Sequence, residues 1–295
     1  MNSGVGLLTD STADLPSHLA EALGIAVVPL TVTLDGQSYL DGVDLTAADF
    51  YLRLRSSSGV ATTSQPSPAR FAEAYERLLE HHSEVVSLHL SSRLSGTFAA
   101  AQQGAEMVGS NRVMVVDSAQ VSMPLALLVL AAQRLAQEGL DAPQILQRLA
   151  PVRAAVHVYF MVATLQHLLR GGRIGRATAL LGGVLQVRPL LTIEEGVVAP
   201  LERVRTSERA LSRLGELARA AFPDRPLCAI IGQADAEEAA ERLMRELDPS
   251  PESLIVLPLG PVVGAHAGPG TAGLGFYPAD LLPLGLGHVG LASRA

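Results

Sequence analysis

The sequence predicts an α/β protein of two domains: an N-terminal parallel sheet with flanking helices, then a C-terminal mixed α/β domain. With 295 residues, the chain reaches the roughly 250–300 residues at which a single core stops growing. Apolar runs alternate with helical patterns in the first half, which is typical of a parallel sheet covered by helices. A hairpin pattern in the second half indicates antiparallel pairing. We place the boundary near Pro151, between residues 1–151 and 152–295.

The first domain is expected to alternate strands and helices. Apolar or β-branched runs predict strands at residues 5–9, 25–34, 85–90 and 113–116. Apolar residues at helical spacing, together with capping residues, predict helices near 16–23, 68–79, 97–108, 124–137 and 141–149. Gly24 stands where the first helix should end, and Ser67 with Pro68 forms an N-cap and first-turn pair for the second.

The second domain is expected to mix antiparallel strands with helices. Strands are predicted at residues 156–162, 190–193, 197–204, 227–231 and 253–257, and helices at 208–221 and 236–247. A short helix should begin at Thr164 and end at Gly171. Glu194, Glu195 and Gly196 form the predicted hairpin turn. Asp235 with Glu238 predicts a capping box for the last helix.

Composition excludes several classes of function. The longest apolar run, residues 123–132, is shorter than the roughly 20 residues that cross a bilayer, so we expect no integral membrane protein. A net charge of −7 argues against nucleic-acid binding. All 22 basic residues are arginine, which removes Schiff-base lysine chemistry. Because the N-terminus has no secretory pattern and Cys228 stands alone, we expect a cytoplasmic protein.

Hydroxyl-rich loops follow three of the predicted strands, at residues 9–12, 91–97 and 117–118. Because ligands bind outside the carboxyl ends of parallel strands, these loops should share one crevice. Two other polar segments, residues 62–66 and 266–271, offer similar neutral groups. No cysteine or acidic residue stands at metal-ligand spacing around His266, so we predict no metal site. The site should instead suit a small anion or a carboxylate.

Alternative interpretations remain at the level of single motifs. Residues 10–15 are explained by helix capping, but the four hydroxyls around Gly96 exceed what capping needs and favour ligand binding. A serine hydrolase would use Ser95 as nucleophile and His266 as base, although the paired glycines of a nucleophile elbow are absent. Arg170 and Arg173 either face solvent at a helix end or contact a phosphate.

In their order along the chain, six motifs together resemble the DegV family of bacterial fatty-acid-binding proteins. They are Asp10-Ser11-Thr12-Ala13-Asp14-Leu15, Thr63-Ser64-Gln65-Pro66-Ser67, Ser91-Ser92-Arg93-Leu94-Ser95-Gly96-Thr97, Asp117-Ser118, Leu168-Leu169-Arg170-Gly171-Gly172-Arg173-Ile174 and His266-Ala267-Gly268-Pro269-Gly270-Thr271. The resemblance implies a long-chain fatty acid, with no other cofactor, in a slot between the two domains. It also implies a partner, a dihydroxyacetone-kinase-like fatty acid kinase subunit, which phosphorylates the carboxylate to an acyl phosphate for phospholipid synthesis.

Carried over residue by residue, the resemblance assigns two groups of side chains. Those that would bind the fatty-acid carboxylate are Thr63, Ser95 and His266, with Ser64 and Gly96 beside them. Those that would face the kinase or the phosphate are Arg170, Arg173, Arg203 and Arg205. The protein itself is then a non-catalytic partner of a kinase. Two other functions stay open: a serine hydrolase acting on acyl esters, and a lipid carrier or sensor that works without a kinase.

Overall fold

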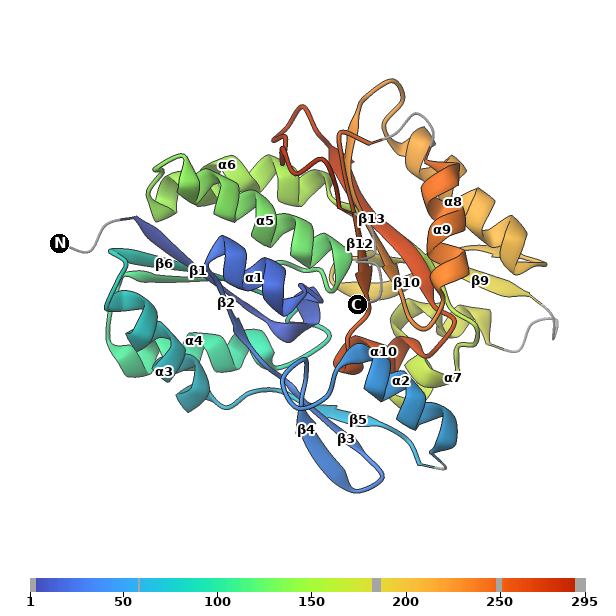
Figure 1. The fold of residues 1–295 in the computed structure, drawn as a ribbon, viewed down its shortest axis with the longest axis horizontal. Helices are drawn as coiled ribbons and strands as arrows, with labels where there is room; N and C mark the ends of the chain where they lie inside the picture. Colours follow the sequence, from blue (N-terminus) through green and yellow to red (C-terminus); the bar gives the residue numbers. More distant parts are fainter. Residues whose placement is uncertain (1–3, 58, 182–186, 248–250, 290–295) are drawn as a thin grey trace.

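A computed structural model describes residues 4–57, 59–181, 187–247 and 251–289, which form three β-sheets (Figure 1). The first sheet has the strand order β2-β1-β6-β7 and is parallel throughout. Its strands are β1 (Val5–Asp10), β2 (Ile25–Val28), β6 (Glu84–His89) and β7 (Val113–Asp117). The predicted N-terminal parallel sheet is confirmed.

Helices cover both faces of this sheet. In Figure 1, α3 and α4 lie on one side, and α5, α6 and α1 lie on the other. Their bounds are α1 (Ser17–Leu23), α3 (Pro68–Leu79), α4 (Thr97–Val108), α5 (Met123–Gln137) and α6 (Ala142–Ala155). Helix α5 also packs against strands β11 and β13 of the second sheet. Because apolar neighbours surround it, the residues from Met123 to Ala132 are all buried.

The second sheet is mixed, with the order β10-β9-β8-β13-β11-β12-β14. Its strands are β8 (His157–Met161), β9 (Arg188–Glu194), β10 (Val197–Val204), β11 (Leu227–Gln233), β12 (Ser253–Pro258), β13 (Ala272–Pro278) and β14 (His288–Val289). Helices α8 (Ser207–Ala221) and α9 (Glu237–Glu246) pack on it. The predicted β9–β10 hairpin is confirmed, and its turn residues Glu195 and Gly196 both have positive φ.

The third sheet was not predicted. It is antiparallel, with order β4-β3-β5, and consists of β3 (Thr31–Leu34), β4 (Gln37–Leu40) and β5 (Thr62–Ser64). Helices α2 (Ala47–Ser56) and α10 (Pro261–Ala267) lie beside it. The prediction of one strand over residues 25–34 is therefore wrong. Proline has no N–H to donate to a ladder, and at Pro29 the run divides between two sheets.

Two helix boundaries also differ from expectation. Helix α6 continues through Pro151 to Ala155, so the proposed domain boundary at Pro151 falls within a helix. The predicted capping box at Asp235 is wrong: the N-cap is Ala236, whose N–H donates to Gln233 Oε1 at 2.7 Å. The Asp235 carboxylate instead pairs with Arg55 of α2 at 2.6 Å, and the Asp235 backbone is left-handed, with φ 53°.

Shorter elements complete the fold near the strand ends. They are η1 (Ser11–Ala13), α7 (Gln166–Arg170) and η2 (Gly175–Leu180). The short helix α7 was predicted, and Thr164 Oγ1 accepts a hydrogen bond from the Gln166 N–H at 3.2 Å. Element η1 carries the first hydroxyl-rich loop directly after β1, and its N-cap is Asp10.

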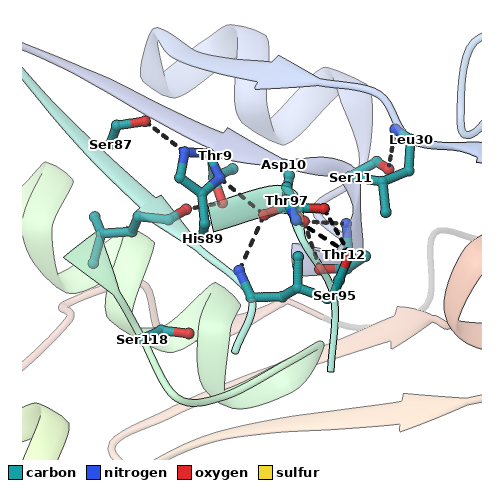
Figure 2. A network of polar contacts seen from close by, with 12 residues as sticks. Thr9, Asp10, Ser11, Thr12, Leu30, Ser87, His89, Ser95, Thr97 and Ser118 are labelled. Atoms are coloured by element: carbon teal, nitrogen blue, oxygen red, sulfur yellow. Dashed lines mark hydrogen bonds and ion pairs between the residues drawn. The ribbon is translucent and has the colours of Figure 1, made fainter. Parts of the chain in front are cut away.

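A fully buried carboxylate fixes the ends of β1 and β6 (Figure 2). Asp10 Oδ2 accepts hydrogen bonds from His89 Nδ1 at 2.9 Å and from the Leu90 N–H at 3.0 Å. Asp10 Oδ1 accepts from the N–H and the hydroxyl of Thr12, at 3.1 and 2.5 Å. Asp10 thus joins the last residues of two neighbouring strands to the turn that presents Thr12.

The network continues behind His89. Its Nε2 lies 2.6 Å from Ser87 Oγ, which lies 3.0 Å from the Tyr75 hydroxyl on α3. The Ser87 hydroxyl thus connects the His89 ring to Tyr75. All four side chains are fully buried. Each of these linked side chains has a hydrogen-bond partner, which offsets the cost of burying its polar atoms.

We predict that Asp10→Asn destabilises the fold by about 1–3 kcal/mol, because an amide nitrogen cannot accept the hydrogen bonds that Oδ2 accepts. Urea titration of unfolding measures this change. Asp224→Asn is the matched control, since Asp224 is exposed and asparagine tolerates its positive φ. Equal stability of the two variants would contradict a structural role for Asp10.

Candidate functional site

A cavity lies between the loops of the first sheet, helix α10 and the second sheet. It contains about 810 Å³ of space between protein atoms, part of which is open to solvent. Both halves of the chain contribute to its wall. The lining residues are Thr12, Leu30, Thr63, Leu90, Leu94, Ser95, Val121, Ser122, Met123, Val158, Phe160, Leu168, Arg173, Ile193, Val198, Leu259, Val262, Val263, His266, Ala267 and Thr271.

Most of the wall is apolar. Val158 and Phe160 come from β8, Ile193 from β9, and Met123 from the start of α5. Two glycines leave room for Met123: a Cβ at Gly232 would lie 2.8 Å from Met123 Sδ, and one at Gly275 would lie 2.8 Å from Met123 Cβ. The apolar wall therefore suits an apolar group, which would lose contact with water where it touches the wall.

Polar groups in the wall include a threonine–histidine pair. Thr63 Oγ1, on β5, lies 2.8 Å from His266 Nε2 on α10. Residues 203 positions apart in the sequence thus meet. Ser95 also lines the cavity, and its Oγ lies 2.9 Å from Thr97 Oγ1 at the start of α4. The hydroxyls of Thr63 and Ser95 are oriented by these partners.

The His266 ring is neutral near physiological pH. Burial, and secondarily the positive charge of Arg173, lowers the pKa of His266 to about 4. Its Nδ1 is buried and has no hydrogen-bond partner among the residues that the structure describes. Gly171 leaves space for this atom, because a Cβ there would lie 2.2 Å from Nδ1. A ligand that reaches His266 meets a neutral imidazole, whose hydrogen-bonding atoms depend on the tautomer.

Arg173 places a permanent charge beside this pair. Its Nε donates to the Leu94 carbonyl at 3.1 Å, and its Nη1 donates to the Gly171 carbonyl at 2.6 Å. Among the described residues that line the cavity, Arg173 is the only one with a permanent charge. The site therefore combines neutral groups with one fixed positive charge, which suits an anionic head group.

The other predicted site residues lie outside the cavity lining. Ser64 is exposed on β5, and Gly96 lies beneath Gln65, whose Oε1 would clash with a Cβ at Gly96. Arg170 and Arg205 are exposed, and Arg203 Nη2 donates to the Ala179 carbonyl at 3.1 Å. The structure thus brings Thr63, Ser95, His266 and Arg173 to one cavity and leaves Arg170, Arg203 and Arg205 at the surface.

Sequence reasoning missed Ser122 as a lining residue. Its Oγ donates to Asp14 Oδ2 at 2.5 Å, and its N–H donates to the Thr12 carbonyl at 2.7 Å. A serine directly before a helix that begins with Met123 and Pro124 predicts an ordinary N-cap. In the structure Ser122 makes no side-chain capping bond and has φ 61° and ψ −131°. Residues other than glycine rarely adopt this backbone conformation, so the sequence gives no signal for it.

The geometry does not pair Ser95 with His266 as nucleophile and base. A serine nucleophile needs a base within hydrogen-bond reach. Ser95 Oγ bonds to Thr97, whereas His266 Nε2 bonds to Thr63. Within the described part of the chain, no group of three or more His, Cys, Asp or Glu side chains is arranged to hold a metal ion. None of the helices that the structure describes is long and apolar enough to cross a membrane.

Comparison with known proteins identifies the family. Residues 4–279 match the family profile described as "Uncharacterised protein, DegV family". A DegV domain-containing protein of Deinococcus radiodurans is 42% identical over 285 residues, covering 93% of this chain and 98% of that protein.

Solved structures agree with this match. A fatty-acid-binding DegV family protein from Thermus thermophilus is 38% identical with a TM-score of 0.89, covering 93% of this chain and 99% of that one. A stearic acid-binding protein from Eubacterium ventriosum is 26% identical with a TM-score of 0.85, covering 93% and 98%. Since the profile, the sequence relatives and the fold all agree over most of its length, the chain belongs to the DegV family.

Proposed function

We propose that the protein binds a long-chain fatty acid in the cytoplasm and presents its carboxylate to a partner kinase. One observation carries this proposal: an apolar cavity whose wall also includes the Thr63–His266 pair, Ser95 and the charged side chain of Arg173. The acyl chain fills the apolar part, and the carboxylate lies among the polar groups. Related structures of the family that bind fatty acid or stearic acid support the choice of ligand.

The energetics favour a long chain over a short one. Each methylene taken out of water contributes about 0.8 kcal/mol. A short carboxylic acid would leave much of the apolar wall without contacts, whereas a long chain gains enough to offset the cost of ordering itself. The polar groups then fix the orientation of the carboxylate, since Thr63, Ser95 and Arg173 can all donate hydrogen bonds to it.

The proposed transfer of phosphate requires that a carboxylate oxygen stay available as a nucleophile. Neutral hydroxyls and the neutral His266 ring hold the carboxylate without neutralising it fully. A dihydroxyacetone-kinase-like subunit would meet one or more of the exposed residues Arg170, Arg203 and Arg205, since guanidinium groups favour phosphate or acidic side chains. The acyl phosphate would then enter phospholipid synthesis.

We expect the purified protein to retain a fatty acid, because an empty cavity of this kind lacks the contacts that its wall would make with an acyl chain. Native mass spectrometry followed by organic extraction identifies the ligand. If well-folded protein yields no acyl species, and added stearate changes neither the mass nor the melting temperature, the fatty-acid proposal is wrong.

Thr63→Val and His266→Ala should each weaken fatty-acid affinity by roughly 10- to 100-fold, because a hydrogen bond to a charged group contributes about 1.5–3 kcal/mol. Valine keeps the shape of Thr63 and removes only its hydroxyl. Titration of a fluorescent fatty acid measures the effect. Ser64→Ala, next in sequence but exposed and outside the cavity lining, is the matched control and should bind as the unaltered protein does. Unchanged affinity in both site variants would remove Thr63 and His266 from the clamp.

Substitutions at two arginines near one another in the sequence should separate fatty-acid binding from phosphorylation of the fatty acid. Arg173→Ala removes the permanent charge at the cavity and should lower affinity by roughly 10-fold or more. Arg170→Ala, at an exposed position, should leave affinity within about twofold but slow ATP-dependent acyl-phosphate formation by the kinase. The two assays are run on the same samples, with Arg148→Ala, exposed on α6, as control. Normal turnover in Arg170→Ala would favour a carrier in which this residue has no kinase role.

A further inference from the structure

Two buried carboxyl groups meet at the start of helix α10. Asp14 follows η1 and is 7% exposed, and Asp41 follows β4 and is 4% exposed. Both approach Gly260, the N-cap of α10: a Cβ there would lie 3.0 Å from Asp14 Oδ1 and 3.2 Å from Asp41 Oδ1. A side chain at this position would press tightly against both acids, which would have to shift by a few tenths of an ångström.

Asp14 connects α10 to the wall of the cavity. Its Oδ1 accepts from the Gly260 N–H at 2.8 Å, and its Oδ2 accepts from Ser122 Oγ at 2.5 Å. Asp14 and Ser122 both have positive φ, at 54° and 61°. Such backbone conformations are held only where surrounding contacts enforce them. The hydrogen bond between Ser122 and the Asp14 carboxylate thus joins two residues with strained backbones. One of them, Ser122, lines the cavity.

Asp41 makes a second connection to α10 and keeps one oxygen unused. The Ser11 side chain and the Val262 backbone act to lower the pKa of Asp41, against the larger effect of burial. Asp41 Oδ2 is buried and has no partner among the residues that the structure describes. An ionised carboxylate with an unpaired buried oxygen is costly, whereas a protonated carboxyl at the same place loses much less solvation.

The charged and titratable groups around the pair do not favour its ionisation. Asp10, on β1, raises the pKa of both carboxyls. Tyr51 of α2 uses its hydroxyl on the Leu259 carbonyl at 2.9 Å. The remaining groups nearby are His18 of α1 at the rim of the adjoining pocket, Asp44 on the turn after β4, and the Arg55–Asp235 ion pair. Within the described residues, no arginine donates a hydrogen bond to either carboxyl.

We propose that Asp14 and Asp41 are positioning residues for the ligand site, and that they hold the start of α10 while the pair retains a proton at neutral pH. Helix α10 supplies Val262, Val263 and His266 to the cavity wall. Loss of the proton leaves two negative charges against one glycine and loosens the helix that carries the carboxylate-binding histidine. The effect on lipid release rests on the proposed fatty-acid binding.

The direction of the pH dependence follows from burial. Burial chiefly raises the pKa of Asp41 to about 7, and it raises the pKa of Asp14 well above its ordinary value. A carboxyl whose pKa is higher in the folded protein than in the unfolded chain favours the folded state fully at low pH. That contribution is lost as pH rises from about 4 through about 7. The start of α10 should therefore loosen above neutral pH.

Asp41→Asn is the decisive variant, because asparagine resembles the protonated carboxyl and cannot ionise. Hydrogen exchange of residues 261–267, expressed as protection factors and compared with α3, is measured on delipidated protein from about pH 6 to about pH 8.5. In the unaltered protein the protection of α10 should fall by up to about tenfold per pH unit above 7. In Asp41→Asn the protection should stay constant, and Asp224→Asn should behave like the unaltered protein. An identical pH profile in Asp41→Asn and the unaltered protein overturns the proposal.

Two further measurements keep the test decisive. If Asp41→Asn fails to fold, infrared spectroscopy of the unaltered protein tests for a buried protonated carboxyl at neutral pH, and its absence overturns the proposal. The dissociation rate of a fluorescent stearate analogue should rise with pH in the unaltered protein and not in Asp41→Asn. A protein that binds no stearate but shows the exchange profile supports the proton-dependent hold on α10 and contradicts the proposed function. A protein that binds stearate but lacks the exchange profile contradicts the proton-dependent hold on α10 and supports the proposed function.

Discussion

The packing of α5 between two sheets is the constraint on which the rest of the structure depends. One side of α5 packs on β1 and β6, and the other packs on β11 and β13. The carboxyl ends of the first sheet are thereby fixed opposite β8 and β9, and the space left between them is the cavity. A shift of α5 would move Ser122 and Met123 together, because Ser122 directly precedes this helix and Met123 is its first residue.

The cavity combines two chemical demands that usually conflict. A long apolar wall lowers the local dielectric, which makes any charge there expensive. The protein limits that cost by using one permanent charge, Arg173, whose guanidinium is already bound to two backbone carbonyls, and by keeping His266 neutral. Binding an anion then adds the missing countercharge, so the occupied site is electrically better balanced than the empty one.

The sequence was sufficient for elements that repeat a regular pattern. Strands β1, β6 and β7, helix α4 and the β9–β10 hairpin follow from apolar periodicity and turn residues, and all of them lie close to the predicted bounds. The third sheet was missed because its strands are short and partly exposed, so they carry little apolar signal. Ser122 was also missed, because its conformation depends on contacts with Asp14 and Thr12, which are far away in the sequence. The Asp14–Asp41 pair was missed because its two members approach each other only at the distant Gly260.

The position of β13 has a consequence for how the protein is made. In the second sheet β13 lies between β8 and β11, although the ribosome synthesises it after both. Until β13 emerges, the hairpin partners β8, β9 and β10 have no backbone ladder joining them to β11 and β12. The nascent chain therefore carries two incomplete sheet fragments with open edges, which are vulnerable to aggregation. On insertion, one late strand pairs with both edges in the same step.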